Sequence, residues 1–313
     1  MSAVTQRHWH AMGTNCHVLI HSHHVAPDVN RPDPLSAVVA LVADMEARWS
    51  RFLPTSELSR INERSGQQVT VSDLTVFAVR RALAARECTG GRFDPTILPS
   101  LRTAGYDRDF AQMSARSGAR AAVEDTPKMA GAEVVVDVDA GTVRVERGAA
   151  IDLGGIAKGL AADMAATAVI GSDGVRGSCV NLGGDLRGHG EPPTAAGWGI
   201  AIDDPTDAGT TLATVAFAAG GAATSSTRRR RWRSGSHEVH HIIDPHTGVS
   251  ADDGIWSVTV LATSAERAEV LATAAIVGGP EDGRRLLSDA GVPALLVEEH
   301  HHHLIGAFTE YVR

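Results

Sequence analysis

Glu269 and Thr273 have the side chains and the spacing of a divalent-metal site. Ser264 is placed to cap a helix that contains both, so the carboxylate and the hydroxyl, four residues apart, project from one face. Such hard oxygen donors suit Mg²⁺, which takes one or two protein carboxylates and fills its other positions with water and substrate phosphate. The alternative is an exposed glutamate and a threonine bonded to its own helix, and the spacing alone leaves both open.

A glycine pair followed by a lysine offers a place for a phosphate group. Gly154 and Gly155 stand immediately before an Ala-rich helical segment, where free backbone N–H groups and the positive end of the helix dipole attract anions. Lys158 adds a cation in the first turn. The chain lacks both the G-x-G-x-x-G pattern after a strand and the Walker pattern. These residues predict a pyrophosphate cradle, with a tight turn and a solvated lysine as the alternative.

The segment 237–241 reads H-E-x-x-H, the zinc-protease pattern. In a helix His237 and His241 would be about 6 Å apart along the axis, but in a strand they are about 13 Å apart. Val239 and Ile242 favour a strand, so we do not expect a zinc site. His241, and Asp244 in the turn that follows, remain candidates for acid–base chemistry at a strand end.

Residues 228–231 are four consecutive arginines. Binding to nucleic acid is one interpretation, but 29 Lys and Arg against 37 Asp and Glu give a net charge of −8, the wrong sign for that partner. We expect a solvated loop, or a guanidinium that reaches a small anionic ligand, and no nucleic-acid partner. The histidine run 300–303 is assigned no role.

The composition is that of a folded protein without an evident membrane anchor. The chain has 313 residues, of which 43% are hydrophobic and 21% charged. Its three cysteines are widely separated and form no C-x-x-C pair, which favours a reducing compartment. Neither an N-terminal apolar stretch nor a run of about 18 apolar residues occurs. We therefore expect a cytoplasmic protein.

Hydrophobic periodicity and breakers predict the elements that must position these residues. The expected helices cover 36–52, 73–88, 264–277 and 280–290, and a further Ala-rich helix follows the segment 151–159 and ends near residue 171. The expected strands cover 16–20, 134–138, 142–145, 179–182, 198–202, 211–217, 239–243, 256–261 and 292–297. Strands come in runs with helices between them, which predicts an α+β fold with largely antiparallel or mixed sheets. We expect one catalytic unit over 1–313, or two closely packed subdomains of about 1–150 and 151–313.

Taken in chain order, eight segments resemble the ApbE family, the FAD:protein FMN transferases. Each segment is weak evidence alone, and their shared order carries the resemblance. The segments are Met12–Thr14, Ser56–Asn62, Asp94–Thr96, Asp152–Gly159, Asn181–Asp185, Ala223–Ser225, His241–Gly248 and Ala268–Thr273.

The resemblance implies an ApbE-like fold and an enzyme that uses Mg²⁺ to pass FMN from FAD to a Ser or Thr hydroxyl of an acceptor flavoprotein, releasing AMP. It implies metal ligands at Ala157 (through its carbonyl), Glu269 and Thr273, where the family usually has Asp in place of Glu269. We expect catalytic roles for His241, Asp244 and Lys158. The implied FAD contacts are Met12, Asn62, Asp94, Thr96, Asp152, Gly154, Gly155, Lys158, Thr224, Ser225 and His241.

Two other functions stay open at this point. One is a flavin-binding or electron-transfer protein without transferase activity. The other is an FAD hydrolase, in which water replaces the acceptor hydroxyl and the products are FMN and AMP. Release of AMP and its dependence on an acceptor distinguish the three.

Overall fold

The computed structural model describes residues 2–23, 33–113, 130–172, 174–207 and 209–313. The helices are α1 (Pro34–Trp49), α2 (Glu57–Glu63), α3 (Asp73–Cys88), α4 (Leu98–Thr103), α5 (Phe110–Met113), α6 (Ala157–Ala168) and α7 (Ala265–Asp289), with 3₁₀ turns η1 (Pro95–Ile97) and η2 (Phe308–Tyr311). The strands are β1 (Ser2–Ala11), β2 (Thr14–His23), β3 (Val69–Thr70), β4 (Val134–Asp137), β5 (Thr142–Val145), β6 (Val175–Leu182), β7 (Asp185–Gly190), β8 (Trp198–Asp203), β9 (Thr211–Phe217), β10 (Gly220–Ser226), β11 (Arg231–Ser234), β12 (His237–His240), β13 (Ser257–Ala262), β14 (Ala294–Val297) and β15 (His302–Ile305).

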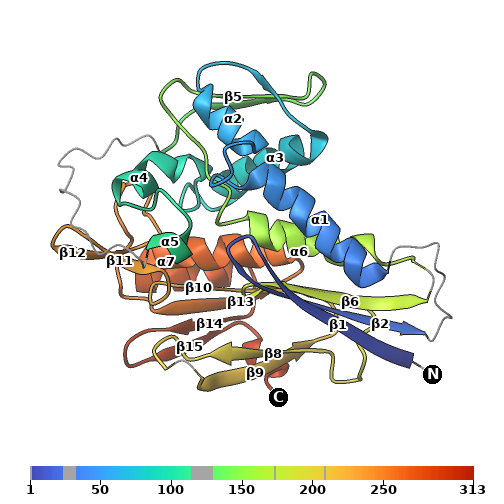
Figure 1. Cartoon of the computed structure of the whole chain (residues 1–313). Coiled ribbons are helices and arrows are strands. Elements are labelled where there is room, and N and C mark those ends of the chain that lie inside the picture. The colour runs from blue at the N-terminus through green and yellow to red at the C-terminus, as the bar shows by residue number, and fades with distance from the viewer. Residues whose placement is uncertain (1, 24–32, 114–129, 173, 208) are drawn as a thin grey trace.

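An eight-stranded antiparallel sheet forms the centre of the molecule, in the order β1-β2-β6-β7-β10-β13-β14-β15. Helices α1, α6 and α7 lie over one face, and the hairpin β8–β9 lies on the other (Figure 1). The small sheet β3-β5-β4 lies with α2 and α3 beyond the helical layer, and β11–β12 form a separate hairpin. The predicted α+β class with antiparallel sheets is therefore confirmed.

Local signals in the sequence account for the predicted helices, which are confirmed as α1, α3, α6 and α7. Asp33 caps α1 and Ser72 caps α3, where the Ser72 side chain accepts the N–H of Thr75 at 3.4 Å. The expected break before residue 280 is present inside α7, because Gly279 has a φ of 72° and precedes Pro280.

Buried apolar clusters hold the layers together. The largest joins α1, α3 and α6 to β2 and the small sheet, and includes Val42, Val143 and Leu160. A second lies between α7 and strands β13 and β14, and a third fills the space between the central sheet and β8–β9. The largest cluster thus takes side chains from both sides of residue 150, and the division into two subdomains stays a prediction.

Several strands of the central sheet, among them β1, β7 and β10, are not predicted by the sequence analysis. Strand β10 reads Gly-Gly-Ala-Ala-Thr-Ser-Ser, a composition of low β-propensity in the middle of the sheet. The small residues are required there, because a Cβ on Gly221 would lie 2.1 Å from the backbone nitrogen of Ala265 at the start of α7. Within the described ranges, no helix is both long and apolar enough to cross a membrane.

Candidate active site

A cavity of about 860 Å³ collects most of the residues that the sequence analysis selects. Its wall takes side chains from the start of α6, the middle of α7, strand β10 and the segment after β12. The predicted site residues that line it are Met12, Asp94, Asp152, Gly154, Gly155, Ala157, Lys158, Thr224, Ser225, His241, Glu269 and Thr273. Segments far apart in the chain therefore meet at one site large enough for a dinucleotide.

Three predicted residues do not lie on the cavity wall. Asn62 instead forms two hydrogen bonds with the backbone of Ile151, at 2.9 and 2.8 Å. Thr96 is buried and donates its hydroxyl to Asp94 at 2.7 Å, so it orients a residue that does line the cavity. Asp244 accepts hydrogen bonds within its own turn, from the backbone and side chain of His246 and the side chain of Thr247. The hydrogen bonds of Asn62, Thr96 and Asp244 therefore hold the loops and turns around the cavity in place.

A buried cluster of two carboxylates and one lysine forms the most polar part of the wall. The ammonium group of Lys158 forms ion pairs with both Asp185 and Glu269, whose side chains are 4% and 3% exposed. The second oxygen of Glu269 accepts the backbone N–H of Gly159 at 2.8 Å. Burial and the nearby charge of Asp185 raise the pKa of Glu269. Burial alone would lower the pKa of Lys158, but the two carboxylates raise it, so Lys158 stays charged.

The close approach of α6 and α7 positions this cluster. A Cβ on Gly159 would lie 2.6 Å from the carbonyl oxygen of Ala265, so only glycine allows the two helices to meet there. Asp163 of α6 accepts the backbone N–H groups of Ala265 and Glu266 at 2.9 and 3.0 Å, and so caps the start of α7. These contacts bring Lys158 and Glu269, 111 residues apart in the chain, together.

The donors around Glu269 fit a magnesium ion. Thr273 lies one turn further along α7, and its hydroxyl is 3.0 Å from that of Ser225 on β10. The cavity wall presents carboxylate oxygens of Asp185 and Glu269 together with hydroxyl and carbonyl oxygens, which are the ligands that Mg²⁺ prefers. Among the described residues, no group of three His, Cys, Asp or Glu side chains could hold a metal.

His241 is the predicted base, and it lines the cavity directly after strand β12. Its Nδ1 is buried without a hydrogen-bond partner in the described part of the chain. Desolvation, then the positive charge of Arg230, lowers the pKa of His241 well below its usual value, so the imidazole is neutral. The segment forms strand β12 over His237–His240, with His237 exposed at its start, so the predicted strand in place of a helix is confirmed.

The ApbE family model matches residues 12–296 of the chain. The chain belongs to the ApbE family. A FAD:protein FMN transferase of Treponema pallidum is 29% identical over 316 residues, which cover 91% of this chain and 82% of the relative. One of Rhodobacter capsulatus is 31% identical over 283 residues, which cover 87% of this chain and 52% of that relative. The crystal structure of the ApbE protein from Thermotoga maritima has a TM-score of 0.86 at 28% identity and covers 99% of this chain and 100% of its own.

This ApbE chain also has cavity residues that the sequence analysis misses. Asp185 ends the segment Asn181–Asp185, but nothing in the sequence spacing predicts its ion pair with Lys158. Arg51 is 5% exposed and stacks against Phe52 and Tyr106, with its guanidinium carbon 4.2 and 4.6 Å from the ring centroids. Its Nη2 is buried without a partner among the described residues. Aromatic and cationic groups of this kind are typical of a site for a planar ligand with polar substituents.

Proposed function

We propose that the protein transfers FMN from FAD to a Ser or Thr hydroxyl of an acceptor flavoprotein, in a Mg²⁺-dependent reaction that releases AMP. The observation that carries the proposal is the buried cluster of Lys158, Asp185 and Glu269 on the wall of the cavity. The relatives named FAD:protein FMN transferase support the same activity. FAD and the acceptor are the proposed partners, without nucleic acid. Three free cysteines support a reducing compartment such as the cytoplasm.

The chain's own residues fit the needs of attack on a diphosphate. The hydroxyl oxygen of the acceptor forms a bond to the FMN phosphorus, and the bond from that phosphorus to the bridging oxygen breaks, so AMP leaves. His241 is neutral and takes the hydroxyl proton. Lys158 and the backbone N–H of Gly155 offset the negative charge that develops on the phosphate oxygens. The N–H of Gly154 instead donates to Asp152 at 3.1 Å.

Glu269 and Thr273, together with the carbonyl of Ala157, are the residues that would hold the metal ion. Mg²⁺ bound there supplies positive charge to the diphosphate. Because Glu269 is bonded to Lys158 and to the N–H of Gly159, its carboxylate is fixed in place. A fixed ligand lowers the cost of assembling the site when FAD arrives.

Chromatography of the nucleotides tests the proposed function. The purified protein is incubated with FAD and Mg²⁺, with and without an acceptor flavoprotein that carries a Ser or Thr attachment site. Transfer predicts AMP only when the acceptor is present. AMP with free FMN and no need for an acceptor indicates a hydrolase, and bound FAD without AMP indicates a binding or electron-transfer protein.

Replacement of the Thr273 hydroxyl tests the metal site. Thr273→Val keeps the volume of the side chain, and we expect the Mg²⁺-dependent rate to fall about 100-fold or more, because a ligand that contributes several kcal/mol is lost. Steady-state rates across a Mg²⁺ titration measure the effect. The matched control is Thr167→Val, since Thr167 is an exposed helical threonine bonded to its own helix at 2.8 Å. Equal rates for the two variants would remove Thr273 from the metal site.

A further inference from the structure

Arg230 is a cavity residue that the proposed mechanism does not use. It lines the cavity and has a φ of 51°, in the left-handed region that non-glycine residues rarely occupy. Among the residues that the structure describes, Met12 is the other non-glycine residue with a positive φ, and it also lines the cavity. No hydrogen bond or ion pair of the Arg230 side chain is present in the described part of the molecule. A strained residue with an unpaired charge in a site is a candidate for function.

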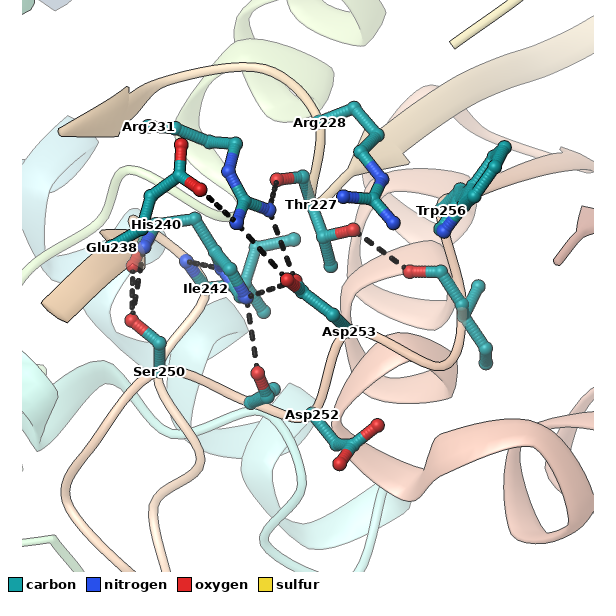
Figure 2. A network of polar contacts seen from close by, with 12 residues as sticks. Thr227, Arg228, Arg231, Glu238, His240, Ile242, Ser250, Asp252, Asp253 and Trp256 are labelled. Carbon is teal, nitrogen blue, oxygen red and sulfur yellow. Dashed lines mark hydrogen bonds and ion pairs between the residues drawn. The ribbon is translucent and has the colours of Figure 1, made fainter. Parts of the chain in front are cut away.

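The residues on both sides of Arg230 are anchored, which holds the strained conformation. Thr227 donates its hydroxyl to the carbonyl of Ile255 at 2.9 Å. Arg231 forms two bonds with the carboxylate of Asp253, at 3.1 and 3.0 Å, and a third with the carbonyl of Thr227 at 3.0 Å (Figure 2). The turn between the two anchors therefore cannot relax without breaking buried or part-buried bonds.

The same carboxylate also anchors the strand that ends directly before His241. Arg231 and His240 face each other as the end pair of the β11–β12 hairpin. Asp253 contacts both, since its Oδ1 is 3.3 Å from the Nε2 of His240 (Figure 2). Arg230 directly precedes β11 and His241 directly follows β12, and both line the cavity. One clamp at the end of the hairpin thus positions the two residues together.

The charge of Arg230 acts on the polar part of the site. After desolvation, it is the largest cause that lowers the pKa of His241, and it also opposes the raised pKa of Lys158. Its charge therefore acts on both the base and the lysine, yet no carboxylate among the described residues pairs with it. A part-buried guanidinium without an acceptor is costly, and a phosphate with two free oxygens matches its paired donors.

We propose that Arg230 binds the diphosphate of FAD, in a position preset by the Asp253 clamp. The inference rests on the proposed function and extends it with a substrate contact. The guanidinium donates to phosphate oxygens next to Lys158, and no covalent bond to Arg230 forms. Its contribution is specific to ligands with phosphate groups, so riboflavin, which has none, should not depend on it.

Binding measurements with two flavins test the assignment without any turnover. Flavin fluorescence titrations compare FAD and riboflavin on the wild type, Arg230→Gln and Arg230→Gly. We expect the affinity for FAD to fall about tenfold or more in both variants, with riboflavin affinity unchanged. Arg233→Gln is the matched control, because Arg233 is exposed on the β11–β12 hairpin and its substitution removes one positive charge, as Arg230→Gln does. It should bind FAD as the wild type does.

Arg230→Gly keeps the test valid if the other variant is unstable. Glycine occupies a positive φ without strain, so this variant should unfold at or above the wild-type temperature while it loses FAD affinity. Unchanged FAD affinity in a folded variant, or an equal loss for riboflavin, would overturn the inference and leave the proposed function standing. A wild type that binds no FAD would contradict the proposed function and the inference together.

Discussion

Lys158→Met should abolish FMN transfer and also destabilise the folded protein. The substitution leaves Asp185 and Glu269 buried side by side without a cation, and removal of one partner from a buried ion pair costs about 3–5 kcal/mol. The free energy of unfolding from urea denaturation measures the second effect. Added Mg²⁺ should recover more stability in the variant than in the wild type, because the ion replaces part of the missing charge.

The double variant Lys158→Met/Glu269→Gln separates the two effects. Removal of one charge from each side of the pair should restore part of the stability, while transfer stays abolished. If Lys158→Met alone has wild-type stability and rate, the cluster does not have the role that we assign to it. The free energy of unfolding is also measured for Glu269→Gln alone. If the double variant loses more stability than the two single variants lose together, the ion pair is not the cause of the destabilisation.

His241→Gln should lower the rate of transfer by about 10²- to 10⁴-fold, the usual range for the loss of a general base. FAD affinity should fall much less than the rate, because other residues bind the diphosphate. His237→Gln is the matched control, since His237 is the exposed first residue of β12, the strand that ends directly before His241. Comparable losses in the two variants would favour a shared structural cause over a base at His241.

The pH dependence follows from the neutral state of His241. Burial lowers its pKa in the folded protein below the usual value of about 6.5, so the unfolded chain binds more protons as the pH falls. The stability that this residue contributes is therefore present at neutral pH and is lost as the pH drops below about 6.5. The rate should show no decline from His241 between pH 8 and pH 6.5. An acidic limb with a midpoint above pH 7 that disappears in His241→Gln would contradict this.

The sequence predicts those elements whose boundaries depend on contacts within a few residues. Ser72 and Ser264 are caps whose bonds are made within one turn, and α3 and α7 begin directly after them. The break at Gly279 also depends on local backbone geometry alone. Strand β10 could not be predicted in this way, because its glycines are set by the approach of α7, a contact between distant segments.

The candidate site shows the same limit. Glu269 and Lys158 were selected from their own surroundings, but their ion pair depends on how α6 packs on α7. Asn62 belongs to one of the segments that resemble the ApbE family, yet its side-chain amide forms hydrogen bonds with the Ile151 backbone. No spacing rule predicts that contact. In the sequence Arg230 is only part of a basic run, and its strained φ and the lack of a partner among the described residues are visible only in three dimensions.

The intact mass of an acceptor flavoprotein after incubation with FAD, Mg²⁺ and this protein is the most direct test of the central claim. Transfer predicts that the acceptor gains the mass of one FMN less one water, with an equal amount of AMP released. The gain should be absent when the Ser or Thr of the attachment site is replaced by alanine. An acceptor of unchanged mass, in a mixture where FAD is consumed or remains bound, would contradict the claim.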